Sequence, residues 1–195
     1  MNIDFLKNSI RSIVPLSEEE WSFMSSMLVQ EAIAKGEYLF HAGHVFNKLT
    51  FVTSGILIYY KTDKNFEEYT TDIAFPGDWI SDTYSRIYNK PSFMNVKAIV
   101  DSEIITISEE NLNRLYEQLP KMEHFGRTLT EFALAHYIEI SLQLQTTTAK
   151  ERYIILQEKH PEYIMSIPQY HLANYLGITP KSLSRIRREI ANGGK

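Results

Sequence analysis

The sequence of 195 residues contains no cysteine. Disulfides, thiolate zinc sites, cysteine-ligated iron–sulfur clusters and thiol redox sensing are therefore excluded for this sequence. No apolar run approaches the roughly 18 residues that span a bilayer, and no signal peptide opens the sequence. From these absences we expect a cytoplasmic protein that does not act in a membrane.

Signatures of catalysis are also missing. The sequence has no GxSxG motif, no P-loop and no GxGxxG motif. His41 and His44 frame a glycine turn without a third ligand in register, and no two histidines make an HExxH-like pair. Asp78 and Asp82 lie four residues apart, but turn and helix-start roles account for them better than a carboxylate pair. We therefore expect neither an enzyme nor a metal site.

The charge is low overall but unevenly distributed. The formal net charge is −4. Residues 146–195 hold eight Lys or Arg against four Asp or Glu, whereas residues 1–145 hold twelve against twenty. A basic C-terminal segment on an acidic body places any phosphate contacts near the C-terminus.

The last thirty residues predict two helices joined by a glycine turn. Gly177 supplies the positive φ that a short turn requires, Thr179 is a good N-cap, and Pro180 fits the first helical position. Apolar residues of the two helices are spaced to pack together: Leu172, Ala173, Leu176, Ile178, Leu183, Ile186 and Ile190.

The other side of the second helix is polar and basic. Its predicted DNA-contacting residues are Thr179, Lys181, Ser182, Ser184, Arg185 and Arg188. A helix of this kind, held at a fixed angle by a partner helix, fits the major groove of DNA. We therefore expect double-stranded DNA as a partner.

The middle of the sequence predicts a small β structure between helices. Ser17 to Glu20 form a capping box ahead of an opening helix. From about residue 32 to 107 short β-branched and aromatic segments alternate with turn signals, which suggests a small antiparallel barrel or jelly roll. The predicted strands are 37–40, 49–53, 56–60, 67–74, 93–100 and 103–107.

Helices are predicted again from Ser108 onward, and a long one runs from 121 to 145. One seam of the long helix is formed by Phe125, Leu129, Phe132, His136 and Ile140, and another by Leu134, Ile138 and Leu142. A helix with two apolar faces needs two partners, and the simplest pair is its own β domain and the same helix of a second subunit. We assign the first seam to dimerisation; a helix buried wholly within one chain is the alternative.

With this order of elements, the chain resembles the Crp/Fnr superfamily of bacterial transcription regulators over essentially its whole length. Residues 35–43, 51–55 and 75–80 look like the family's early strand and turn, its next glycine turn and the entry to its nucleotide cassette. The resemblance implies an α+β protein: a β-roll of the cyclic-nucleotide-binding type at 1–120, a dimerisation helix at 121–145 and a helix-turn-helix at 146–195. It also implies a homodimer that binds a two-fold-related DNA site, with RNA polymerase as a further partner.

The same resemblance assigns roles in DNA binding. Lys181 and Arg185 fall at positions that the family uses for base contacts, and an arginine suits guanine O6 and N7. Arg188 and Lys150 are better interpreted as phosphate contacts. Only five residues follow Ile190, so we expect no β-hairpin wing of the kind that often follows the second helix.

The family's nucleotide pocket is degenerate in this sequence. Ungapped placement puts Ser81 and Asp82 at the family's Gly-Glu pair and Ser92 and Phe93 at its Arg-Ser pair. Without the arginine a buried phosphate loses its cation, so we do not expect cyclic AMP to bind. We assign Asp82, Thr83, Ser92 and Phe93 to an effector pocket that takes a different small molecule or none. The alternative function is a ligand-binding module that acts through protein contacts.

Overall fold

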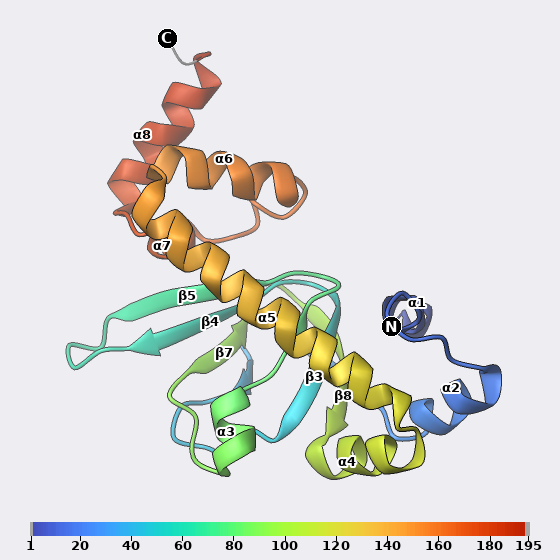
Figure 1. Ribbon diagram of the computed structural model, residues 1–195. Coiled ribbons are helices and arrows are strands. Elements are labelled where there is room, and N and C mark those ends of the chain that lie inside the picture. The colour runs from blue at the N-terminus through green and yellow to red at the C-terminus, as the bar shows by residue number, and fades with distance from the viewer. Residues whose placement is uncertain (1, 194–195) are drawn as a thin grey trace.

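Two four-stranded antiparallel sheets pack face to face in the computed structural model, which describes residues 2–193 (Figure 1). The first sheet has the order β1-β8-β3-β6, formed by Val29–Ile33, Ser102–Ser108, Lys48–Ser54 and Trp79–Ile80. The second has the order β2-β7-β4-β5, formed by Tyr38–Phe40, Asn95–Ala98, Leu57–Thr62 and Glu68–Ala74. The predicted β-roll is confirmed.

Side-chain alternation along the strands gives the second sheet two apolar faces. In β4, Leu57 and Tyr59 contribute to the core between the sheets, whereas Ile58 and Tyr60 belong to a different cluster on the outer face. Successive side chains of a strand point to opposite faces, so a continuous apolar run marks a strand that is covered on both sides.

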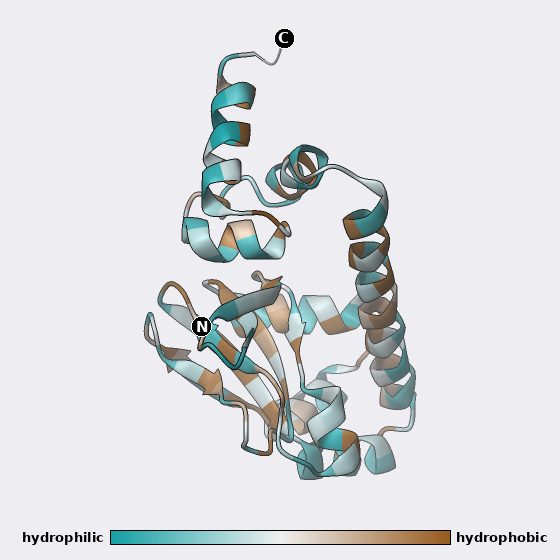
Figure 2. Ribbon diagram, turned by 90° about the vertical axis from the view of Figure 1, so that its left-hand side faces the viewer, coloured by the Kyte–Doolittle hydropathy of each residue, from teal (hydrophilic) through white to brown (hydrophobic). Residues whose placement is uncertain are grey.

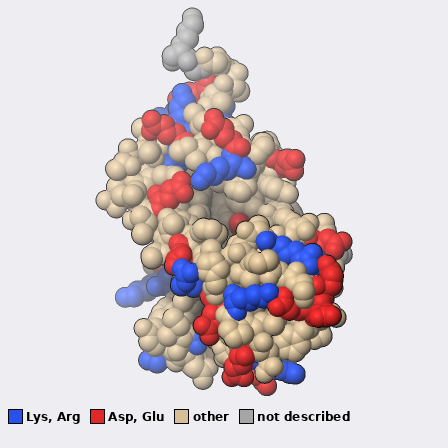
Figure 3. Space-filling view, turned by 45° about the vertical axis from the view of Figure 1, so that its right-hand side comes forward, with Lys and Arg blue, Asp and Glu red and all other residues tan. Residues whose placement is uncertain are grey.

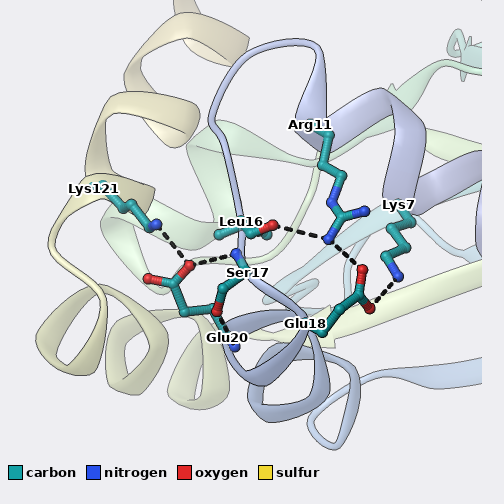
Figure 4. A network of polar contacts seen from close by, with 7 residues as sticks. All are labelled: Lys7, Arg11, Leu16, Ser17, Glu18, Glu20 and Lys121. Carbon is teal, nitrogen blue, oxygen red and sulfur yellow. Dashed lines mark hydrogen bonds and ion pairs between the residues drawn. The ribbon is translucent and has the colours of Figure 1, made fainter.

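Helices cover the outer face of the first sheet. They are α1 (Ile3–Arg11), α2 (Glu18–Ser25) and α4 (Glu109–Gln118), and they share a buried cluster with β3, β8 and the first turns of α5. The predicted capping box is present, with Ser17 accepting from the Glu20 amide and the Glu20 carboxylate accepting from the Ser17 amide. The Lys121 ammonium donates to that carboxylate at 2.7 Å, which ties the start of α5 to α2 (Figure 4).

The long helix α5 (Lys121–Thr146) connects the β sandwich to the C-terminal helices. It lies along one side of the molecule and reaches from the sandwich to the C-terminal helices (Figure 2). The short helix α3 (Thr83–Tyr88) follows β6 and begins at Asp82, whose carboxylate accepts from the Ser85 amide.

Three further helices follow α5: α6 (Ala149–Lys159), α7 (Gln169–Tyr175) and α8 (Pro180–Ala191). They pack on the outer face of β4 and β5. One buried cluster contains residues from both parts: Ile56, Ile58, Tyr60, Ile73, Phe75, Ile99, Tyr153, Leu156, Ile164, Ile167, Leu172, Ala173, Leu176, Leu183 and Ile186. The C-terminal helices are therefore docked on the sandwich. The proposed division at 120 and 145 stays a prediction.

Four elements were not predicted, namely α1, β1, β6 and α3, and several boundaries differ. Helix α1 and strand β1 precede the region where we expected β structure to begin, and the opening helix ends at Ser25 rather than continuing to Leu28. Strand β6 has only two residues. No strand follows α8 within the residues that the structure describes.

Candidate nucleic-acid interface

Helices α7 and α8 form the predicted helix-turn-helix. Gly177 has a φ of 70° and forms the turn between them. Thr179 caps α8 by accepting from the Ser182 amide at 3.2 Å, and Pro180 is the first helical residue. Leu183 and Ile186 are buried against α7, which fixes the opposite face of α8 toward solvent.

The exposed face of α8 carries positive charge. Lys181, Ser184, Arg185 and Arg188 follow one another at helical spacing, and all four are exposed. Among the described residues, the only ion pair on this face joins Arg185 Nε to Glu189 at 3.8 Å, with 73% of the Arg185 side chain exposed. Such an exposed pair is weak, so the Arg185 guanidinium is available to a ligand.

The remaining arginine of α8, Arg187, has a different environment. Arg187 Nε donates to the Tyr153 hydroxyl at 3.3 Å, and its guanidinium lies 5.6 Å from the Tyr153 ring centroid. This contact holds α8 against α6. Arg185 and Arg188 are exposed whereas Arg187 is partly buried, and the assignment of the first two to DNA contacts stays a prediction.

Arg152 is a structural residue that the sequence analysis missed. One guanidinium nitrogen donates to the carbonyls of Gln143 and Thr147, and another donates to the carbonyl of Leu176 at 2.8 Å. Arg152 thereby joins the C-terminal end of α5 to the C-terminal end of α7, where cations are favoured by the helix dipole. A lone arginine in a helix gives no sequence signal for this role.

The hairpin of β4 and β5 binds the helix-turn-helix directly. The Glu68 carbonyl accepts from the Tyr170 hydroxyl at 2.7 Å and from the Asn174 side-chain amide at 2.8 Å. The Thr70 hydroxyl and His171 Nδ1 are 2.9 Å apart in a buried hydrogen bond. Burial lowers the pKa of His171, so this imidazole is held in its neutral form.

A cavity of about 390 Å³ lies between the sandwich, α5 and the C-terminal helices. Figure 3 shows the surface hollowed between the sandwich and these helices, with acidic and basic side chains interspersed around it. Lining residues from the three parts include Tyr59, Asp72, Trp79, Phe132, His136, Ile140, Arg152, Leu156 and Tyr175.

The polar groups of this cavity are mostly neutral or paired. Burial raises the pKa of Tyr59 and of Tyr175, and it raises the pKa of Tyr137 to about 12, so these phenols keep their protons. His136 Nε2 lies 3.3 Å from the buried Asp72 carboxylate, and this hydrogen bond raises the pKa of His136.

The residues assigned to an effector pocket do not line this cavity. Asp82 is engaged as the cap of α3, and Ser92 is buried with its hydroxyl donating to the Met94 carbonyl. Phe93 is 56% exposed and packs against Tyr84, and Thr83 is exposed. The structure does not bring the four together around one cavity, because the first two serve local turns while the last two point to solvent.

The residues assigned to the dimerisation seam lie in two different settings on α5. Phe125 is only 1% exposed and belongs to the core of its own chain, and Leu129 packs against that core. Phe132, His136 and Ile140 line the cavity, and Phe132 is also 60% exposed. The second seam is exposed along its whole length, with Leu134, Ile138 and Leu142 at 61%, 51% and 55% exposure. Periodicity identified both seams, and the seam that meets a second subunit stays a prediction.

Two further findings concern the residues that the structure describes. No cluster of three or more His, Asp or Glu side chains is arranged to hold a metal ion. No helix among them combines the length and the apolar character needed to span a bilayer.

Comparison with known proteins identifies similar families. Residues 30–119 match the family model of the cyclic nucleotide-binding domain. An anaerobic regulatory protein of Pasteurella multocida (strain Pm70) is 25% identical over 183 residues, which cover 88% of this chain and 66% of that protein. The alignment thus spans just under two thirds of that relative.

Solved structures show the same fold. FixK2 from Bradyrhizobium japonicum superposes with a TM-score of 0.74 at 18% identity, over 86% of each chain. A transcriptional regulator of the crp/fnr family from Eubacterium rectale superposes with a TM-score of 0.66 at 19% identity, over 91% of this chain and 85% of that one.

Proposed function

We propose that this chain is a transcription regulator of the Crp/Fnr superfamily and that it binds a two-fold-related DNA site as a homodimer. The observation that carries the proposal is the arrangement of α8. Its apolar face is buried against α7 while Lys181, Arg185 and Arg188 are exposed along the opposite face. A helix presented in this way fits the major groove.

Within this proposal the basic residues divide by role. Lys181 and Arg185 lie one turn apart on the N-terminal half of α8, where recognition helices contact base edges. Arg188 follows one turn later, and Lys150 lies near the start of α6. These two contact phosphates, which contribute affinity and salt dependence without reading sequence.

The second subunit binds along the exposed stripe of α5. Leu134, Ile138 and Leu142 are spaced four residues apart, and each is more than half exposed in the single chain. Two copies of this helix pack the stripe against itself about a two-fold axis, which is the self-complementary arrangement of a cyclic dimer. The symmetric pair then presents two copies of α8.

The cavity provides a route by which an effector changes DNA binding. A small molecule that fills it contacts the sandwich, α5 and the C-terminal helices at once. Because Tyr170, His171 and Asn174 already hold α7 on β5, such a ligand alters the free energy of this docked arrangement. Contact with RNA polymerase stays a prediction from the resemblance.

Two arginine variants test the DNA-binding role. An operator is first selected from random duplex DNA, and Kd is then measured at several salt concentrations for wild type, Arg185→Ala and Arg188→Ala. We expect Arg185→Ala to lose roughly 5- to 150-fold in specific affinity at one base pair while non-specific binding changes little. We expect Arg188→Ala to weaken both kinds of binding equally and to reduce the salt slope by about one.

Two results would contradict the proposal. Equal loss of specific and non-specific affinity in Arg185→Ala rejects base readout by that residue. The absence of DNA binding at any salt concentration rejects the regulator and favours a module that acts through protein contacts.

A further inference from the structure

A buried carboxylate in the cavity has unused hydrogen-bonding capacity. Asp72 is only 8% exposed and lines the cavity from β5. Its Oδ1 accepts from the Ile73 amide at 2.9 Å and lies 3.3 Å from His136 Nε2, so this imidazole nitrogen is already paired with the carboxylate. Among the described residues no hydrogen bond reaches Oδ2, although this oxygen is not enclosed by protein. Because a buried polar atom without a partner is unfavourable, Asp72 favours a further donor from the cavity.

A second carboxylate lines the same cavity. Asp78 lies in the turn after β5, and its Oδ2 accepts from the Phe75 amide at 2.8 Å. Within the part of the chain that the structure describes, its Oδ1 accepts no hydrogen bond. The Asp78 side chain is exposed, so a ligand in the cavity can reach it. The free polar atoms of these two residues are therefore acceptors.

The cations around the cavity are already engaged. The Arg152 guanidinium donates to three main-chain carbonyls, and its remaining nitrogen, Nε, is enclosed. Lys159 Nζ lies 3.2 Å from the Glu139 carboxylate, so these two charges offset each other. Burial lowers the pKa of His160, whose neutral imidazole stacks on the Phe75 ring with the centroids 3.7 Å apart. An anionic ligand would find no free cation among these residues.

The rest of the lining is largely aromatic and apolar. Rings from the sandwich, α5 and the C-terminal helices border the cavity: Tyr59, Phe75, Trp79, Phe132, Tyr137 and Tyr175. The three phenols keep their protons, so each can donate or accept and favours neither charge of ligand. The face of an aromatic ring attracts a cation. The rings thus add to the preference that Asp72 and Asp78 set.

We propose that the cavity binds a small organic cation, namely a protonated amine carried on an aromatic group. The ammonium group donates to Oδ2 of Asp72, the Asp78 carboxylate adds negative charge, and the aromatic group packs among the rings. The cavity volume of about 390 Å³ falls within the range of sites that hold small organic ligands. This inference names the chemical class of the effector in the proposed function, and its effect on DNA binding rests on that function. The binding itself can be measured without DNA.

Isothermal titration calorimetry of the full chain tests the inference with matched pairs of probes. Phenethylamine and tryptamine carry the ammonium group, whereas phenylpropionate and indolepropionate carry a carboxylate on the same aromatic group and linker. We expect both amines to bind at millimolar concentration or below, and each carboxylate to bind at least roughly tenfold more weakly.

Three variants locate the binding site. Asp72→Asn should weaken amine binding roughly 10- to 100-fold, because it removes a charge-assisted hydrogen bond. Asp78→Asn should weaken it several-fold, and this variant keeps the test decisive if circular dichroism shows that Asp72→Asn does not fold. Asp4→Asn changes an exposed carboxylate of α1 and is the matched control, which should bind both amines as the wild type does.

The outcomes separate this inference from the proposed function. The inference is overturned if neither amine binds, if the carboxylates bind as tightly as the amines, or if amine binding is unchanged in both Asp72→Asn and Asp78→Asn. A chain that binds an amine in this way but binds no DNA refutes the proposed function and leaves the ligand class standing. A chain that binds its selected operator but neither amine refutes this inference alone.

Discussion

Replacing Ile138 by glutamate places a charge at the centre of the exposed apolar stripe on α5. Leu134 and Leu142 lie one turn to either side, and these three side chains are 61%, 51% and 55% exposed from Leu134 to Leu142. In a symmetric dimer the two copies of residue 138 lie close to the two-fold axis. The substitution therefore puts two carboxylates near each other in an apolar interface.

The cost can be worked from the exposed fractions. Complete burial of a large aliphatic side chain is worth roughly 1.5–3 kcal/mol, so the half that stays exposed on Ile138 is worth about 1 kcal/mol per copy. The two glutamates lose about 2 kcal/mol of this burial and add the cost of two partly desolvated carboxylates, at least roughly 1 kcal/mol each. The sum is about 4 kcal/mol or more, which weakens dimerisation on the order of 10³-fold.

Sedimentation equilibrium over a range of protein concentrations measures this effect. Ile138→Glu is expected to be monomeric at concentrations where wild type is dimeric. Phe132→Glu tests the other seam: Phe132 lines the cavity and is 60% exposed, and its substitution should leave the dimer intact if the Leu134 stripe is the interface. A dimeric Ile138→Glu protein, or a monomeric Phe132→Glu protein, refutes the assignment of the interface to the Leu134 stripe.

Three further expectations follow from the contacts of single residues. Arg152→Met removes hydrogen bonds to three backbone carbonyls and should lower the free energy of unfolding by about 3 kcal/mol. Lys150→Met is the control and should change it by less than about 0.5 kcal/mol. Equal unfolding midpoints in urea for the two variants would contradict this. His171 has a lowered pKa in the folded chain, so on acidification the unfolded chain binds a proton at this residue before the folded chain does. The free energy of unfolding should therefore fall as the pH drops below 6.5. His136 has a raised pKa, so its contribution to stability is present below pH 6.5 and is lost as the pH rises through the raised value. Urea titrations at several pH values should show that His171→Gln removes the first of these pH dependences and His136→Gln the second. An unchanged pH dependence of the free energy of unfolding in these variants would reject the assignment. Gly55→Ala should yield little folded protein, because a Cβ there would lie 2.5 Å from the Ser102 Cα and the residue has a φ of 90°; a wild-type yield and melting temperature would refute it.

Much of the fold could be predicted from local signals. The capping boxes at Ser17 and Thr148 involve residues three positions apart, and both are present in the structure. The glycine turn at Gly177 and the cap at Thr179 depend on equally local preferences. The resemblance added the order of the domains, which the fold comparisons support.

The features that could not be predicted from the sequence are those set by contacts between distant segments. The two apolar seams of α5 were evident, but periodicity does not tell which seam meets the sandwich and which stays exposed. Arg152 and Gln169 act on backbone and side-chain atoms up to 24 residues away, and no motif marks either residue. The docking of Tyr170 and His171 on β5 spans about a hundred residues.

The symmetry of the selected DNA site tests the central claim most directly, because it depends at once on an outward α8 and on a two-fold dimer. Selection from random duplex DNA, followed by footprinting, should give an inverted repeat whose half-site centres are about 10–10.5 base pairs apart, or a multiple of that spacing. Protection should be equal in both halves. A single half-site, a direct repeat or the absence of any enriched sequence would contradict the account.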